Sequence, residues 1–122
     1  MGAVTLSEVS SAFCAIGGAG GSMKLSSSPW GDVQTQKQIA PGIISVRTSS
    51  HGGIKVSPEL WEKMKVKETA FSRGGWFEED CDWAIVALSF PDFFNQEDIA
   101  VARATLKNIY GGKYLSILEE TP

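Results

Sequence analysis

Residues 76–91 read WFEEDCDWAIVALSFP and join a dense acidic cluster to an uninterrupted apolar run. Four carboxylates fall within the five residues from Glu78 to Asp82, and the apolar residues follow directly. A run of this kind has to be buried, so the acidic cluster is expected at the edge of the core. Periodicity alone does not separate a central strand from a buried helix over so short a run.

We predict that the run is a helix, and a central one, because apolar residues occupy all its sides. Pro91 stops it, since the residue before a proline is displaced from the α region. The acids between Glu79 and Asp82 would then fall in the first turn, where the helix dipole favours negative charge. Ile85 and Val86 favour the alternative, a strand. The strong helix formers in the run are Ala84, Ala87 and Leu88.

The composition is that of a globular domain with no basic surface. The chain has 122 residues, 43% of them hydrophobic, and four tryptophans. A net charge of −3 leads us to expect no direct binding of nucleic acid. No apolar segment reaches the roughly 18 residues of a membrane span, and no signal peptide precedes the body. We therefore expect a cytoplasmic protein in which Cys14 and Cys81 are free thiols rather than a disulfide.

Two parts are expected along the chain. Residues 1–28 would form an N-terminal helix with a Gly/Ser-rich linker, and residues 29–122 a compact α+β domain. The glycines lack the lysine and the preceding strand of a phosphate-binding loop. The helix is predicted over residues 5–16 because apolar side chains recur there at helical spacing, namely Leu6, Val9, Phe13 and Ile16.

For the compact domain we expect an antiparallel sheet of two to three strands, packed against the central helix and two to three further helices. Alternating residues predict a first strand over 33–39, and the Pro41-Gly42 turn leads into a second over 43–48. A third, shorter strand is expected over 54–56.

The remaining helices carry start and stop signals. Ser57 before Pro58 predicts a helix that reaches Met64. Asn95 predicts a cap for a second helix that ends at Gly111. A short helix or arm is expected over residues 114–118.

His51, the only histidine, stands in a Ser-His-Gly-Gly segment. Its imidazole could serve as a general base or a metal ligand. We favour a loop residue whose ring is hydrogen-bonded to a nearby carboxylate, because single residues outside a motif seldom prove catalytic. A further hypothesis places His51 beside the acidic cluster.

Cys81 is expected to be a buried, unreactive thiol. Each neighbouring carboxylate opposes a thiolate by about 1 kcal/mol at about 4 Å, even in water. The helix dipole favours the thiolate by only about 0.3–1 kcal/mol.

The acidic cluster could hold a hard cation such as Mg²⁺ or Ca²⁺, with Glu78 and Asp82 on one helical face. No EF-hand spacing and no pair of zinc ligands accompanies it. We therefore expect no metal site and no cofactor. Helix capping, or ion pairs with basic residues nearby, is the favoured role, and those basic residues are Lys63, Lys65, Lys67 and Arg73.

Trp76 and Phe77 are the best candidates for an exposed aromatic patch of the kind that protein partners bind. They follow a glycine pair and precede the acids, although core packing is the commoner fate of aromatic residues. We assign no catalytic residue. The candidate residues for binding a protein or a ligand are His51, Trp76, Phe77, Glu78, Glu79, Asp80 and Asp82.

Four segments of the chain form a recognisable pattern: PWG (29–31), IAPGI (39–43), SHGGI with SPE (50–59) and GWFEEDCDWA (75–84). Together they resemble an uncharacterised domain of small accessory proteins from bacterial plasmids and phages. The resemblance covers residues 29–110 and implies a cytoplasmic protein of a mobile element, without an established reaction. Small proteins of that origin are often inhibitors of host defence, including anti-CRISPR and anti-restriction factors.

The leading hypothesis is a non-enzymatic protein that binds and inhibits a host protein complex, such as a CRISPR or restriction effector. The alternative is a small enzyme, or a ligand- or cation-binding domain, that uses His51 and the acidic cluster Glu78–Asp82. A structural or regulatory module that forms a homodimer stays open.

Overall fold

The structure of the chain, a computed structural model, describes residues 24–119. The predicted N-terminal helix over residues 5–16 and the larger part of the predicted linker lie outside these residues. The division of the chain at residue 29 therefore stays a prediction.

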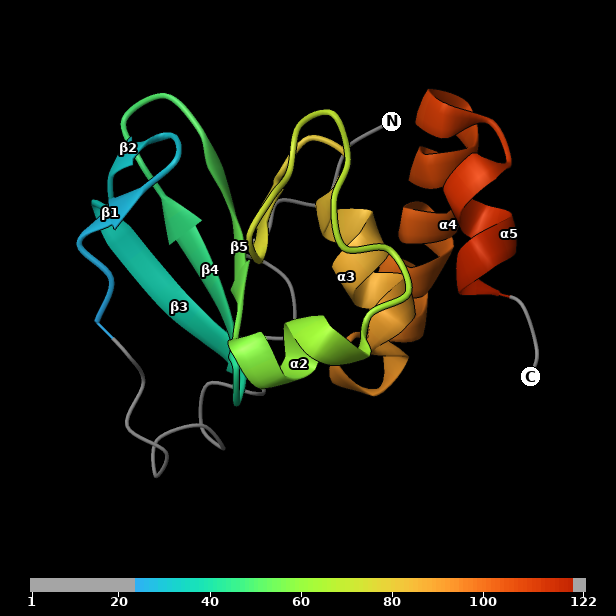
Figure 1. Ribbon diagram of the computed structural model, residues 1–122, viewed down its shortest axis with the longest axis horizontal. Coiled ribbons are helices and arrows are strands. Elements are labelled where there is room, and N and C mark those ends of the chain that lie inside the picture. Colours follow the sequence, from blue (N-terminus) through green and yellow to red (C-terminus); the bar gives the residue numbers. More distant parts are fainter. Residues whose placement is uncertain (1–23, 120–122) are drawn as a thin grey trace.

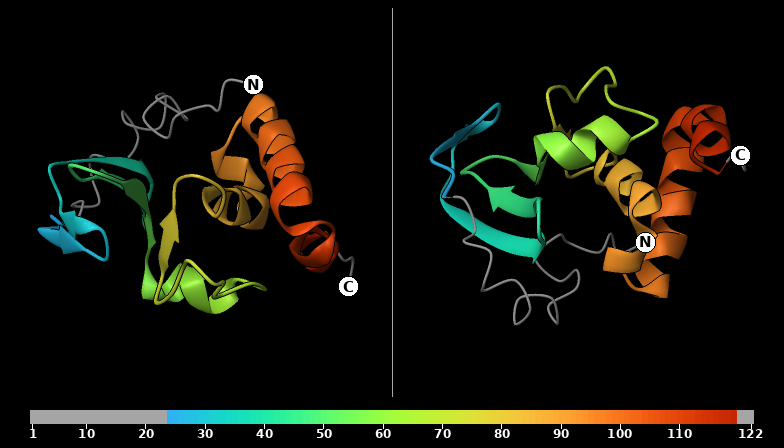
Figure 2. Two further views of the ribbon diagram at one scale, coloured as in Figure 1. Left: turned by 90° about the horizontal axis from the view of Figure 1, so that it is seen from above. Right: turned by 60° about the horizontal axis from the view of Figure 1, so that its bottom comes forward.

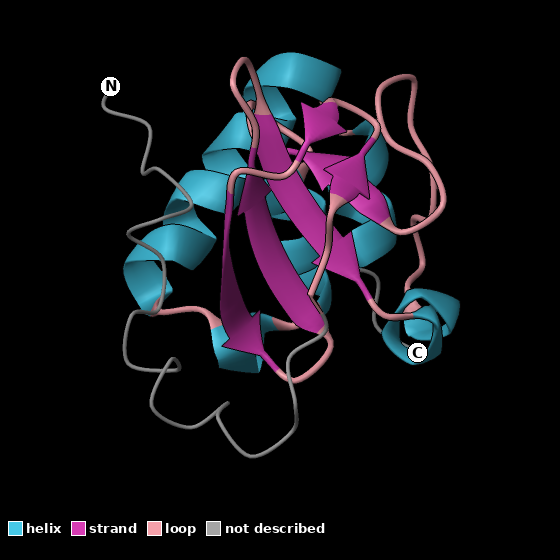
Figure 3. Cartoon of the chain, turned by 90° about the vertical axis from the view of Figure 1, so that its left-hand side faces the viewer, coloured by secondary structure: helices cyan, strands magenta, loops and turns pink. Residues whose placement is uncertain are grey.

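Two antiparallel sheets make up the β part of the molecule (Figures 1 and 3). The main sheet has four strands in the order β3-β4-β5-β6, so each strand pairs with its neighbours along the chain. A two-stranded hairpin of β1 and β2 lies beside it. The strands are β1 (Ser27–Ser28), β2 (Gly31–Asp32), β3 (Thr35–Ala40), β4 (Ile43–Arg47), β5 (Gly52–Val56) and β6 (Trp76–Glu78).

Four α-helices and a 3₁₀ turn lie on one side of the main sheet. In Figures 1 and 2, α3 lies between the sheet and α4, while α5 packs against α4 and also contacts α3. No helix within residues 24–119 has the length and apolar character of a membrane-spanning segment. The elements are α2 (Pro58–Lys63), α3 (Trp83–Ser89), η3 (Pro91–Phe93), α4 (Gln96–Tyr110) and α5 (Lys113–Leu118).

The α+β class and the central helix are confirmed. Every residue of α3 from Trp83 to Ala87 is buried, as expected for a helix enclosed on all sides. The two predicted caps are also present. The side chain of Ser57 accepts the Leu60 N–H at 3.3 Å, and that of Asn95 accepts the Asp98 N–H at 2.7 Å.

The strand count differs from the prediction because residues 76–78 form a fourth strand of the main sheet, β6, and because β1 and β2 form a separate hairpin. Phe77 is buried while Trp76 and Glu78 are half-buried, an alternation with the period of a strand. β6 completes the sheet on the free edge of β5, where Ile54 pairs with Phe77.

The acids consequently do not occupy the first turn of the helix. They lie at the end of β6 and in the tight turn that leads from it into α3, which begins at Trp83. Asp82 stands at the N-cap position, yet its side chain accepts no capping hydrogen bond from the helix. The expected role of the acidic residues in the first turn is therefore wrong.

Candidate functional site

A shallow, open pocket of about 280 Å³ lies at the end of the main sheet where β5 begins and β6 ends. It brings His51 together with two residues of the acidic cluster, Glu78 and Asp80. This placement agrees with the hypothesis that His51 lies beside that cluster. We call the pocket the aromatic-acidic hollow, and it is lined by Trp30, His51, Gly52, Phe71, Glu78 and Asp80.

The loop before β5 holds the backbone of His51 and leaves its ring exposed. The Thr48 hydroxyl donates to the His51 carbonyl at 2.8 Å, and the His51 N–H donates to the Thr48 hydroxyl at 3.0 Å. Within residues 24–119 the imidazole makes no hydrogen bond or ion pair, so the predicted bond to a carboxylate is not found there. The ring is therefore available to a molecule in the hollow.

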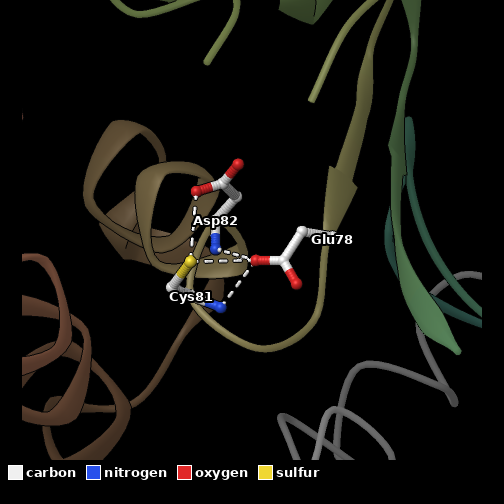
Figure 4. Close-up of side chains that lie close together, drawn as sticks. All are labelled: Glu78, Cys81 and Asp82. Carbon is white, nitrogen blue, oxygen red and sulfur yellow. Dashed lines mark hydrogen bonds between the residues drawn. The ribbon is translucent and has the colours of Figure 1, made fainter. Parts of the chain in front are cut away.

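Glu78 organises the turn between β6 and α3 (Figure 4). Its carboxylate accepts the backbone N–H groups of Asp80, Cys81 and Asp82 at 2.8–2.9 Å. Burial raises the pKa of Glu78, but hydrogen bonds from the Cys81 thiol and from these N–H groups outweigh that effect and lower it. The side chain is thus held as a carboxylate at the floor of the turn.

Asp82 is fully buried and is the centre of a hydrogen-bonded network. One carboxylate oxygen accepts the hydroxyl groups of Thr69 and Ser72, and the other accepts the Tyr110 hydroxyl at 2.6 Å. Burial, followed by the bond to Asp82, raises the pKa of Tyr110, so the phenol stays protonated as a donor. The network joins the loop before β6, the start of α3 and the end of α4.

Cys81 is buried, with 6% of its surface exposed, as predicted. Its thiol donates to Glu78 Oε1 at 3.0 Å. Burial raises the pKa of Cys81, and the bond to Glu78 raises it further. These surroundings favour the neutral thiol, which acts as a hydrogen-bond donor and not as a nucleophile.

One oxygen each of Glu78 and Asp82 and the sulfur of Cys81 lie within 4.8 Å of one another, close enough to share a cation. A metal would require a thiolate, whereas the surroundings of Cys81 favour the thiol. Both oxygens also already accept hydrogen bonds, from two backbone N–H groups and from Tyr110. The donor set fits a hydrogen-bonded cluster better than a metal site.

The loop between α2 and β6 presents Phe71 to solvent. Thr69 and Ser72, on either side of it, are buried and bound to Asp82. The Thr69 N–H also donates to the Ser72 carbonyl at 3.0 Å, and the Phe71 N–H donates to the Thr69 hydroxyl at 3.0 Å. The backbone of Phe71 is thus anchored, while 61% of the residue is exposed.

Trp30 forms the facing aromatic part of the hollow. Its ring packs against Gly53 so closely that a Cβ atom at that glycine would lie 2.3 Å from Trp30 Cη2. It also meets Trp76 edge to face, with ring centroids 5.7 Å apart. Lys55 Nζ lies 5.1 Å from the centroid of the Trp76 ring. Trp76 therefore supports the wall of the hollow instead of lining it.

The remaining predicted site residues lie elsewhere. Phe77 is fully buried in the core, so the prediction that it belongs to an exposed patch is wrong. Its place in β6 turns it inward toward α3. Glu79 pairs with Arg47 at 3.2 Å, a cation outside the predicted set.

The sequence does not single out Trp30 and Phe71 as site residues. A tryptophan is more often part of the core or its rim, and residues 66–75, which hold Phe71, are mainly polar and indicate a connection. One signal was present: Phe71 is an isolated aromatic residue in a polar segment, with no apolar partner at strand or helix spacing.

A family model described as a domain of unknown function, DUF7007, matches residues 23–122 and so includes every residue that lines the hollow. No curated protein and no solved structure matches the chain.

Proposed function

We propose a function for a chain that belongs to the DUF7007 family, a domain of unknown function: it binds a protein partner through the aromatic-acidic hollow and catalyses no reaction. The observation that carries the proposal is the presentation of Phe71. A large aromatic side chain, 61% exposed, stands on a loop whose backbone is anchored by a buried network.

Such an arrangement favours binding for an energetic reason. An anchored backbone loses little conformational entropy when a partner docks, so more of the interaction energy appears as affinity. Aromatic residues that fill a partner's pocket are frequent hot spots of protein interfaces. The half-buried Trp30 and the exposed Asp80 around the hollow would add aromatic and polar contacts at the rim.

The chemistry of the hollow gives less support to an enzyme. His51 is a potential general base, but a general base can act only on a proton that lies within about 3 Å of it or one water molecule away. Cys81, the nearest thiol in sequence to the acids, is buried and held as a donor. A ligand-binding domain remains the second candidate, because His51, Glu78 and Asp80 share one pocket.

For the partner we propose a host protein complex, and within that class a bacterial defence complex such as a CRISPR or restriction effector. This finer proposal is supported by the resemblance drawn from the sequence. It predicts that expression of the protein restores phage plaquing on a host with an active defence system.

The experiment compares the wild-type chain with Phe71→Ala in affinity purification from a defence-competent bacterial lysate. Ile109→Ala is the matched control, because Ile109 is a comparably exposed apolar residue, at 55%, outside the hollow. We expect a stoichiometric partner that wild type and Ile109→Ala retain and Phe71→Ala loses. Equal retention by all three, or no partner at all, would contradict the proposal.

A further inference from the structure

The aromatic-acidic hollow has a size and a lining that define the chemistry of its occupant. Pockets for drug-sized ligands and cofactors measure about 300–1,000 Å³, and the hollow, at about 280 Å³, is at the lower end of that range. It is large enough for one long side chain. Since it opens at the protein surface, that side chain can come from a docked partner.

The charge of the hollow is negative. Glu78 and Asp80 both line it, and no lysine or arginine is among the lining residues. Glu78 is held as a carboxylate by the N–H groups of the turn. Asp80 is exposed, and only its backbone N–H takes part in that turn. Its carboxylate can therefore bind a molecule from outside without breaking the fold.

Two aromatic side chains line the hollow beside the acids. Trp30 is fixed by Gly53 and Trp76, and Phe71 stands on the anchored loop. Aromatic faces attract cations through the ring quadrupole, most strongly where water is excluded. The same chemistry already operates next to the hollow, where Lys55 lies over the Trp76 ring.

We propose that the aromatic-acidic hollow receives an arginine side chain of the partner protein, with its guanidinium group against Trp30 and Phe71 and its charge met by Asp80 and Glu78. An arginine suits the site better than a lysine because the planar guanidinium stacks on aromatic rings and binds carboxylates through two parallel hydrogen bonds. A neutral imidazole at His51 can accept a further N–H. This inference rests on the proposed function and specifies how the partner is recognised.

The test uses the full chain and the peptide Gly-Gly-Arg-Gly-Gly, with binding followed by NMR chemical shifts. We expect saturable shifts of the Trp30 indole N–H and of the Gly52 amide. The peptide with citrulline, which keeps the shape and removes the charge, should bind about tenfold more weakly, as expected for the loss of a charge-assisted hydrogen bond. Higher salt should weaken the arginine complex.

Asp80→Asn should weaken the arginine peptide about tenfold, whereas Asp92→Asn, which changes an exposed carboxylate in η3, should leave binding unchanged. Thermal unfolding of both variants checks that the fold is kept. Equal binding of arginine and citrulline peptides, shifts that map away from the hollow, or no binding would overturn the inference. Tighter binding of a matched lysine peptide would overturn the preference for arginine.

Failure of this inference and failure of the proposed function give different results. If a purified partner is lost in Phe71→Ala but retained in Asp80→Asn, and the peptide does not bind, the hollow does not recognise arginine although the chain still binds a protein. If the peptide binds as expected but no partner is retained, the proposed function is wrong while the chemistry of the hollow stands.

Discussion

Asp82 shows how a single buried charge is accommodated in this protein. A carboxylate with 0% of its surface exposed has lost its water, which would cost several kcal/mol without replacement partners. The hydroxyl groups of Thr69, Ser72 and Tyr110 replace that water. Because these donors come from separate segments, the side chain also fixes how the segments lie against one another.

Substitution of Asp82 by asparagine should destabilise the fold strongly. The amide group cannot accept on both sides, so at least one hydroxyl of the network loses its charged acceptor, at a cost of about 2–4 kcal/mol. Urea unfolding at pH 7 measures the change. Asp92→Asn, on the surface, should stay within about 0.5 kcal/mol of wild type. A stability of Asp82→Asn equal to that of the control would show that the network contributes nothing.

Cys81 should resist alkylation in the folded protein. Burial and the bond to Glu78 raise its pKa, so the reactive thiolate is scarce at neutral pH. In a Cys14→Ser variant, which leaves Cys81 as the single thiol of the chain, mass spectrometry after iodoacetamide treatment at pH 7.5 should detect modification only when urea is present. Rapid labelling of the native variant would refute the described environment of the thiol.

At the scale of the element, the turn between β6 and α3 depends on Glu78. Three successive backbone N–H groups of the turn converge on its carboxylate, ahead of the first residue of α3. The Asp82 side chain makes no cap bond and instead accepts hydroxyl groups from Thr69 and Ser72 in the loop that carries Phe71. The turn therefore couples the end of the sheet to the central helix and to the hollow.

Glu78→Gln should lower the free energy of unfolding by about 1–3 kcal/mol at pH 7, because the amide NH₂ cannot accept an N–H. The pKa of Glu78 is lowered from the ordinary value of 4.5. Its stabilisation is therefore full above that pH and is lost as the pH falls through the folded-state value. Unfolding curves of wild type and variant should converge as the pH falls below the folded-state pKa of Glu78, which lies under 4.5.

The matched control for this prediction is Glu62→Gln, an exposed glutamate of α2. Its free energy of unfolding should match that of wild type within about 0.5 kcal/mol, both at pH 7 and at low pH. A difference between wild type and Glu78→Gln that persists unchanged at low pH would mean that the ionised carboxylate is not the stabilising species.

For the whole molecule, the close approach of the β1-β2 hairpin to the main sheet decides whether the hollow exists. Trp30 lies in the turn of that hairpin and rests on Gly53 of β5, where no side chain fits. The main sheet, α3 and α4 follow one another on the side of this contact away from the hairpin (Figure 2). The lining of the hollow is thus contributed by segments far apart in the sequence.

Gly53→Ala should displace Trp30 and open the hollow. The new Cβ would lie 2.3 Å from Trp30 Cη2 and 2.5 Å from the Phe77 carbonyl oxygen, and the latter is backbone that cannot easily move. We expect a loss of about 1–3 kcal/mol and a changed near-ultraviolet circular dichroism signal. Gly112→Ala, where nothing lies within 4 Å, is the control. A Gly53→Ala variant with native stability and spectrum would contradict the packing of Trp30.

Local signals in the chain predicted most of the elements correctly. Ser57 and Asn95 begin helices because their side chains accept a free N–H group of the first turn. Pro58 also suits a first turn, since its ring nitrogen has no N–H group. These effects depend only on residues that are close in sequence. The same holds for the turn at Gly42, with a φ of 87°, and for the end of α4 at Gly111. The acidic cluster, His51 and the buried thiol of Cys81 were also recognised from residue type and spacing.

What local signals did not reveal are the assignments that depend on distant residues. Trp76–Glu78 becomes a strand because β5 offers it a free edge, and this overrides the helical pattern that follows. Phe71 and Trp30 line the same hollow for two reasons. Asp82 anchors the loop that carries Phe71, and Gly53, which has no side chain, leaves room for the Trp30 ring. Contacts between segments far apart in sequence have no local periodicity, so the site emerges only when the sheet and helices are packed together.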